Sequence, residues 1–280
     1  KRVYCRSFTI SSVMDDNIKH TGDFLRILRS NGRYAFTTDD LNAKIPKPLK
    51  NIRKDIDRLR EKGEVINIRR GFYTLIPDEY RKMGAIPVEF YIDELMSYLS
   101  KKYYVGLFSA AMFHGAAHQQ PQEFFVVTMA PKPRKIDRNN LMINFSEKKY
   151  YPHAGIEEKK TDTGYFKVAS RELTFLDLIY FEKSAGGLNR VITVLQELSE
   201  KMSISRMKEV TKLDFPLSTF QRAGYIADVV LGNNKLASVF FDRLDEQSLQ
   251  YVLLKSSGKK SDIRDNKWKV IINTQLESDL

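Results

Sequence analysis

One segment, residues 47–62, constrains the fold of this chain more than any other. Its apolar side chains recur every three or four residues, a spacing that predicts a helix with one narrow apolar face. They are Leu49, Ile52, Ile56 and Leu59. The opposite face, at about 100° per residue, carries Lys47, Lys50, Asn51, Lys54 and Arg58. A helix with this division can pack on a core and still present cations to a major groove.

The residues on either side complete a recognisable pattern. Gly63 is expected to end the helix, and "EVINIRRGFYTLIP" then predicts two short strands joined by a basic turn at residues 69–71. Upstream, a helix is predicted over residues 16–29, stopped at Asn31-Gly32. A threonine cap and acidic first-turn residues in "TTDDL", residues 37–41, then predict a short second helix. Three helices followed by a β-hairpin predict a winged helix-turn-helix in residues 1–82.

The charge distribution points to a polyanion partner for this part of the chain. The whole chain has a formal net charge of +11, and residues 1–82 hold 19 Lys and Arg against 11 Asp and Glu, a net of +8. We expect the lysines to contact phosphates, Asn51 to pair with an adenine edge, and Arg69 and Arg70 to reach the backbone or minor groove. Any single lysine on a helix usually belongs to a solvated face, so the interpretation depends on the combination.

Asp55 and Asp57 lie in the same predicted helix. Their D-x-D spacing could belong to the metal carboxylates of a nucleotidyltransferase, but no Gly-Ser motif on a strand precedes them. We interpret them as flanking residues that offset the positive field of the helix.

Residues 83–280 predict a mixed α/β region, which can form two lobes of about 83–170 and 171–280. Helices are expected over residues 88–101 and 106–118, and strands in "EFFVVTMAP", "LMINFS" and "YFKVAS". From Thr174 the pattern becomes helical, and two strand-like pieces, "LQYVLLK" and "WKVIINT", follow. The predicted fold class is therefore α+β, with a helical second half to the larger domain.

The chain offers few candidates for catalysis or metal binding. It has no P-loop and no G-x-S-x-G elbow. Glu157 to Lys160 contain an E-x-K pattern of restriction-type nucleases, but the run is hydrophilic and predicts a turn. His114 and His118 have the spacing of helical zinc ligands, yet H-G-A-A-H lacks the glutamate base and Gly115 weakens the helix. We expect no metal, no cofactor and no catalytic residue.

The same composition sets expectations about location. One cysteine, Cys5, cannot form an intrachain disulfide, which favours a reducing cytoplasm. The longest apolar stretch, residues 103–113, is too short to span a bilayer, and the first residues lack the apolar region of a signal peptide.

Five segments in order carry a family resemblance: "RRGFYTL", "GLFSAAMFHGAAHQQP", "FKVASRELTFLDLIYFEKSAGGL", "FQRAGYIADVV" and "WKVIINTQLESDL". Together they resemble the AbiEi antitoxins of type IV toxin–antitoxin systems, which act in abortive infection and phage defence. The similarity covers nearly the whole length and loosens in residues 130–164.

The resemblance implies a protein with two functions and no enzymatic activity. Its winged helix would bind inverted repeats in its own promoter and repress transcription, with Lys47, Lys50, Asn51, Lys54, Arg58, Arg69 and Arg70 as the DNA contacts. Residues 83–280 would form an antitoxin domain that suppresses a cognate AbiEii nucleotidyltransferase toxin without requiring a stable complex. Two alternatives stay open: a DNA-binding enzyme with a divergent nuclease or transferase domain, and a transcription regulator that responds to a ligand.

Overall fold

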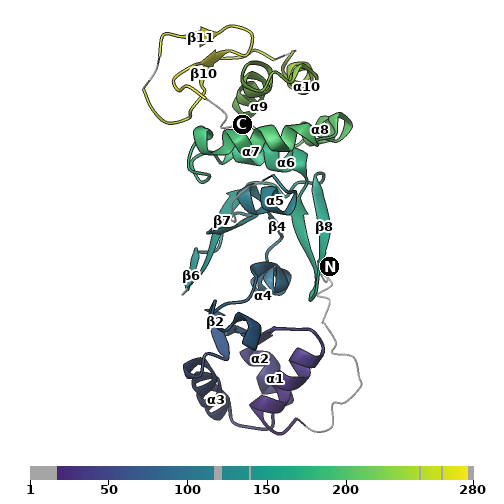
Figure 1. Ribbon diagram of the computed structural model, residues 1–280, viewed down its shortest axis with the longest axis vertical. Coiled ribbons are helices and arrows are strands. Elements are labelled where there is room, and N and C mark those ends of the chain that lie inside the picture. The colour runs from purple at the N-terminus through teal and green to yellow at the C-terminus, as the bar shows by residue number, and fades with distance from the viewer. Residues whose placement is uncertain (1–17, 117–121, 139, 246, 260, 277–280) are drawn as a thin grey trace. The chain divides into compact units, whose positions relative to one another are not determined.

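The computed structural model describes residues 18–116, 122–138, 140–245, 247–259 and 261–276 (Figure 1). The fold is α+β, with helices and several sheets. Contacts divide the chain after Tyr91, with residues 18–91 in an N-terminal unit and the described residues from Ile92 onward in a second unit.

The N-terminal unit combines three helices with a small antiparallel sheet. In chain order its elements are α1 (Thr21–Ser30), β1 (Ala35–Thr37), α2 (Thr38–Lys44), α3 (Leu49–Glu61), β2 (Val65–Arg69), β3 (Phe72–Leu75) and the 3-10 turns η1 (Asp78–Tyr80) and η2 (Val88–Phe90). The strand order is β1-β3-β2. The first strand was not predicted from the sequence, because three residues carry too little pattern to distinguish a strand from a loop.

Local hydrogen bonds determine where the helices begin and end. Thr37 accepts a hydrogen bond from the backbone N–H of Asp40, whose carboxylate accepts one in return from the Thr37 backbone, so α2 begins with the predicted capping box. Helix α1 was predicted from residue 16, but His20 is its N-cap and residues 18–20 are not helical. Gly63 follows α3 with φ of 68°, a left-handed conformation that glycine adopts without strain.

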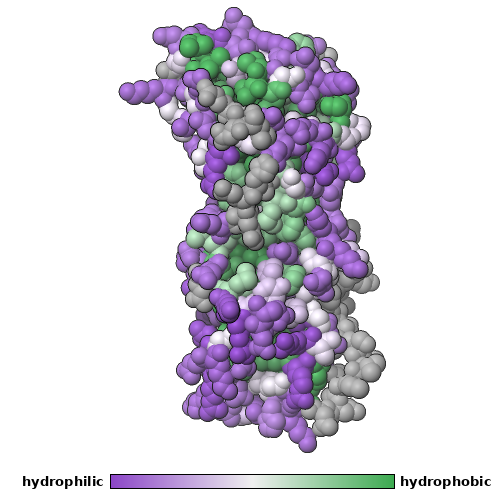
Figure 2. Space-filling view, in the orientation of Figure 1, coloured by the Kyte–Doolittle hydropathy of each residue, from purple (hydrophilic) through white to green (hydrophobic). Residues whose placement is uncertain are grey.

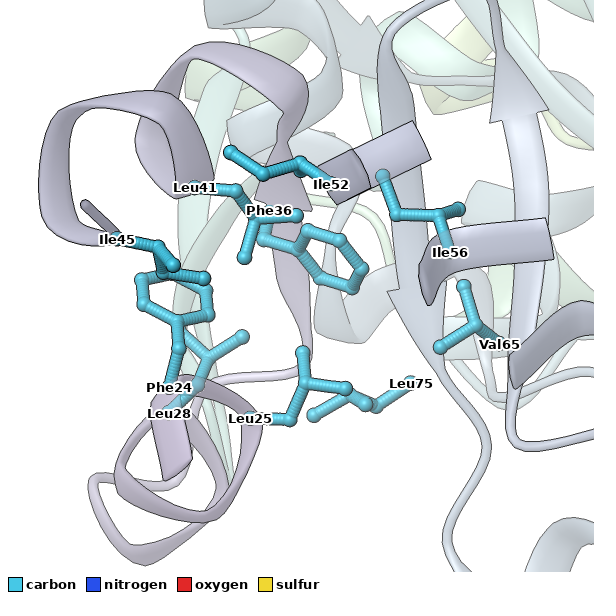
Figure 3. Close-up of a cluster of buried hydrophobic side chains, with 10 residues drawn as sticks. All are labelled: Phe24, Leu25, Leu28, Phe36, Leu41, Ile45, Ile52, Ile56, Val65 and Leu75. Atoms are coloured by element: carbon cyan, nitrogen blue, oxygen red, sulfur yellow. The ribbon is translucent and has the colours of Figure 1, made fainter. Parts of the chain in front are cut away.

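A single hydrophobic core holds these elements together. Figure 3 shows side chains from all three helices and all three strands grouped around Phe36. Its buried members are Phe24, Leu25, Leu28, Phe36, Leu41, Ile45, Ile52, Ile56, Val65 and Leu75. Ile52 and Ile56 are the buried positions of α3, and each contributes about 1.5–3 kcal/mol by its burial. The face of α3 that these two anchor is thereby turned inward, which leaves the opposite face exposed.

The second unit begins with a mixed sheet and its helices. The elements are α4 (Ile92–Tyr98), β4 (Tyr103–Val105), α5 (Leu107–Phe113), β5 (Phe124–Met129), β6 (Ile136–Arg138), β7 (Leu141–Lys148), β8 (Ile156–Thr161), β9 (Gly164–Ala169) and α6 (Arg171–Tyr180). The strands form one six-stranded sheet in the order β6-β7-β5-β4-β9-β8. Parallel pairs β5·β7 and β4·β9 alternate with antiparallel pairs, and α5 packs on β5 while α6 packs on β9.

Helices then dominate, as the sequence predicted. They are α7 (Leu188–Glu200), α8 (Ile204–Val210), α9 (Leu217–Tyr225), the π-helix η3 (Ile226–Val230) and α10 (Asn234–Leu244). A three-stranded sheet closes the described chain, with β10 (Val252–Leu253) and β11 (Arg264–Asp265) on either side of β12 (Val270–Ile271). Figure 1 shows α6, α7 and α8 between the six-stranded sheet and this last group of elements.

Two of the helices predicted in residues 83–280 are shorter than expected. The helix predicted over residues 88–101 is the 3-10 turn η2 followed by α4. The helix predicted over residues 106–118 ends at Phe113, because Gly115 takes a φ of 70° that no α-helix accommodates. His118 lies outside the described residues.

Candidate functional site

The outward face of α3 presents the candidate DNA contacts. Lys50, Asn51 and Lys54 are exposed there, and none of the three makes an ion pair or side-chain hydrogen bond within the described ranges. Figure 2 shows a mostly hydrophilic surface around α3, at the lower left of the view. Two cations and an amide one turn apart can together reach phosphates and a base edge.

Two other predicted contacts are held by a carboxylate. Lys47 precedes the helix, whose N-cap is Pro48, and its Nζ lies 3.3 Å from Oδ2 of Asp55. Arg58 is exposed on α3 and has a guanidinium nitrogen 3.9 Å from the other oxygen of Asp55. The predicted basic face therefore contains two kinds of cation, those with a carboxylate partner and those without one among the described residues.

The hairpin places the last two predicted contacts at its turn. Strands β2 and β3 pair antiparallel, with Arg69 opposite Phe72 and a register shift between Asn67 and Arg69. The Asn67 side-chain amide donates a hydrogen bond to the Arg69 carbonyl at 2.6 Å, which stabilises the conformation of the turn. Arg69 is half-buried and Arg70 is exposed at the tip. Gly71 has a φ of 80°, which this tight turn requires.

Arg53 is a candidate that sequence reasoning missed. It is exposed on α3 one turn after Lys50, and it has no ion pair among the residues described. The sequence shows this cation within the predicted helix. Arg53 was left out because it lies about 60° from Lys50 on the helical wheel, outside the narrow stripe opposite the apolar face.

A buried ion pair joins the sheet to the helices of the second unit. Lys148 of β7 lies 2.5 Å from a carboxylate oxygen of Asp177 on α6, and the hydroxyl of Tyr104 on β4 donates to the other oxygen at 2.7 Å. The Lys148 ammonium also lies 4.0 Å from the centre of the Phe215 ring. Burial raises the pKa of Asp177 and lowers that of Lys148, while their mutual attraction opposes both shifts.

Helix α9, in the segment "FQRAGYIADVV", carries a second set of contacts, which are hydrogen bonds from side chains to backbone carbonyls. Gln221 donates its side-chain amide to the carbonyls of Gln250, Trp268 and Lys269, and Arg222 donates to that of Leu253. These hydrogen bonds attach β10 and the turn before β12 to α9, so the motif has a structural role here.

Residues 104–229, which contain the Lys148–Asp177 pair and the side chains of Gln221 and Arg222, match the family model described as AbiEi antitoxin C-terminal domain. This part of the chain is similar to the antitoxin domain of the AbiEi family. The family resemblance predicted from the sequence is thereby confirmed, and the match supports the role of an antitoxin in a toxin–antitoxin system.

Among solved structures, the chain is similar to the RV2827C protein from Mycobacterium tuberculosis. The TM-score is 0.62 at 13% identity, and the similarity covers 92% of this chain and 93% of that one. At this identity the similarity concerns the fold alone. No curated protein matches the chain. None of the helices described is long and apolar enough to cross a membrane.

His114 is part of the packing of the antitoxin domain. It is the C-cap of α5, and its Nε2 lies 2.6 Å from the carbonyl oxygen of Ala169. Burial lowers the pKa of its imidazole, and the nearby Arg171 and Lys159 act in the same direction. In the parts of the chain that the structure describes, no three His, Cys, Asp or Glu side chains gather as metal ligands would.

The turn predicted at residues 157–160 is wrong, because these residues belong to β8 at the edge of the antitoxin domain's sheet. Charged side chains concealed the strand, and an edge position tolerates them since one side faces solvent. Glu157 pairs with Arg206 at 2.7 Å, and the Lys159 ammonium donates to the carbonyl of Phe113. The E-x-K pattern is thus on a strand, but its side chains hold neighbouring elements.

Proposed function

We propose that the N-terminal unit is a winged helix-turn-helix that binds double-stranded DNA. The observation that carries this proposal is the exposed face of α3, where Lys50, Asn51 and Lys54 have no internal partner among the described residues. The β2–β3 hairpin is the wing, with Arg69 and Arg70 at its turn. Lys47 and Arg58 contribute phosphate contacts at the two ends of the face.

The DNA target is the chain's own promoter, bound at inverted repeats, so that binding represses the operon. The antitoxin domain suppresses a cognate nucleotidyltransferase toxin of the type IV class, without a stable complex being required. We assign DNA binding to residues 1–82 and the antitoxin function to residues 83–280. The family match supports the antitoxin role, and the +8 surplus of residues 1–82 supports the polyanion partner. The protein acts in the cytoplasm and needs no cofactor or catalytic residue for either role.

Two measurements on the full chain and one fragment test the division of functions. Residues 83–280 alone should rescue growth of cells that express the neighbouring toxin gene, yet should fail to repress a reporter fused to the operon promoter. The full chain should do both. If the fragment folds, as judged by circular dichroism, and does not rescue growth, then the two functions are not divided in this way.

A matched substitution tests the DNA-binding face inside the full chain. Lys50→Ala/Lys54→Ala should abolish promoter repression and leave toxin rescue intact. The control is Lys208→Ala/Lys212→Ala, which removes two cations from the region of α8 in the antitoxin domain. If the α3 variant still represses normally, DNA binding through this face is excluded.

A further inference from the structure

Asp55 occupies an unusual position for an acidic residue on a DNA-binding helix. Its carboxylate is only 24% exposed, and one of its oxygens accepts a hydrogen bond from the Thr21 hydroxyl at 3.0 Å. That same oxygen lies 3.3 Å from the Lys47 ammonium, and the second oxygen lies 3.9 Å from Arg58. One carboxylate thus connects the start of α1, the turn before α3 and the middle of α3.

These contacts mimic those that a DNA phosphate would make. Lys47 and Arg58 are the two cations of the predicted face that have an anionic partner, and in both cases the partner is Asp55. A phosphate must displace the carboxylate to obtain either cation, so each contact yields less net free energy than one from an unpaired lysine. A phosphate can bind Lys50, Arg53 or Lys54 without first breaking an ion pair, since none of the three forms one within the described ranges.

We propose that Asp55 is an affinity-setting residue, which competes with DNA phosphates for Lys47 and Arg58 whatever the DNA sequence. This inference rests on the proposed function of α3. Phosphate contacts supply non-specific affinity, whereas base contacts discriminate sequences. A carboxylate that competes with phosphates lowers the affinity for promoter and random DNA alike and leaves the base contact unchanged, so Asp55 sets the overall affinity and its salt dependence.

Asp55→Asn tests the proposal with little change of shape. The amide keeps an oxygen that can accept from Thr21, but it loses the charge that holds the two cations. Binding to a promoter duplex and to a random duplex of equal length is measured by fluorescence anisotropy over a salt series. We expect the affinity for both duplexes to rise about 3- to 10-fold and the salt dependence to steepen by about one to two units, since each additional cation–phosphate pair adds about 0.9 unit to the slope. The promoter-to-random ratio should stay the same, because both complexes gain the same phosphate contacts.

Asp57→Asn is the matched control, because it removes the same charge from the same helix. Asp57 is exposed and pairs with Arg60 at 3.1 Å, and Arg60 lies outside the predicted face. The slope of affinity against salt for this variant should therefore steepen by less than about 0.9 unit, the change that one added cation–phosphate pair produces. In a Lys47→Ala/Arg58→Ala background, Asp55→Asn should no longer steepen the salt dependence, because the cations that it releases are absent.

The outcomes separate this inference from the function on which it rests. If the wild-type chain binds neither duplex, the proposed function fails and this inference fails with it. If the wild type binds and Asp55→Asn leaves the salt dependence unchanged, or steepens it equally in the double-alanine background, the inference alone is overturned. Thermal unfolding of each variant shows whether it is folded. A variant that does not fold would lose affinity for both duplexes instead.

Discussion

The indole ring of Trp268 lies directly against the backbone of Gly224 in α9. A Cβ atom added to Gly224 would come within 1.9, 2.2 and 2.5 Å of three carbon atoms of that ring. Trp268 is almost completely buried, and its indole N–H donates to Asp228 at 2.9 Å, so the ring cannot move aside without losing this bond. The packing of α9 against a turn more than forty residues away therefore depends on the absence of one side chain.

Gly224→Ala should lower the free energy of unfolding by about 1–3 kcal/mol or more, since about 1–3 kcal/mol is the usual cost of overpacking a filled core. Gly22→Ala is the control, because Gly22 also lies in a helix but has no atom within 4 Å of the added Cβ. That change should be neutral or stabilise by roughly 0.5 kcal/mol through reduced backbone entropy. Urea unfolding of both variants measures the difference, and equal midpoints would contradict the close packing.

Lys148→Met should be among the most damaging single changes in the antitoxin domain. It leaves Asp177, which is fully buried, with the Tyr104 hydroxyl as its one side-chain partner among the described residues. Removing one member of a buried ion pair costs about 3–5 kcal/mol, whereas replacing both members with apolar residues can be nearly neutral. Lys148→Met/Asp177→Leu should therefore regain much of the stability in the same unfolding assay. A double variant as unstable as the single one would show that the charges themselves are needed.

His114 should make the stability of the folded state depend on pH in the mildly acidic range. Burial lowers the pKa of its imidazole below the ordinary 6.5, so the folded state binds a proton less readily than the unfolded state does. The stability that neutral His114 contributes is complete above pH 6.5 and is lost as the pH falls from there through the lowered pKa of the folded state. Melting temperatures of the wild type and His114→Gln should therefore converge as the pH falls below 6.5. A constant difference between pH 5 and 8 would count against this coupling.

Lys54→Ala and Asn51→Ala should weaken DNA binding in different ways. Loss of the Lys54 contact should weaken binding to every sequence and reduce the slope of affinity against salt by about one unit. Loss of Asn51 should leave the slope unchanged and relax the preference at one base position, at a cost of about 1–3 kcal/mol for the preferred base. Anisotropy against a set of single-position promoter variants distinguishes the two. Identical changes for both substitutions would mean that Asn51 does not read a base.

Several features of the fold could be predicted because they depend on residues close in sequence. The capping box of Thr37 and Asp40, the apolar spacing of Ile52 and Ile56, and the turn at Gly71 each involve neighbours within a few positions. Helical and hairpin periodicities follow from such local geometry. The basic face of α3 follows from the same periodicity, since burying one side of a helix exposes the other.

Other features depend on partners that the sequence order does not reveal. Strand β1 exists through its pairing with β3, and β8 was mistaken for a turn because its edge position permits charged residues. Asp55 was correctly interpreted as a residue that offsets positive charge, but the sequence could not show that Lys47 and Thr21 share its carboxylate. The sequence by itself determined the presence of the three N-terminal helices, the start of α2 and the charge of the α3 face, since these follow from short-range periodicity. Only the tertiary structure decided which cations are held by carboxylates and that Gly224 must lack a side chain, because both depend on contacts between distant segments.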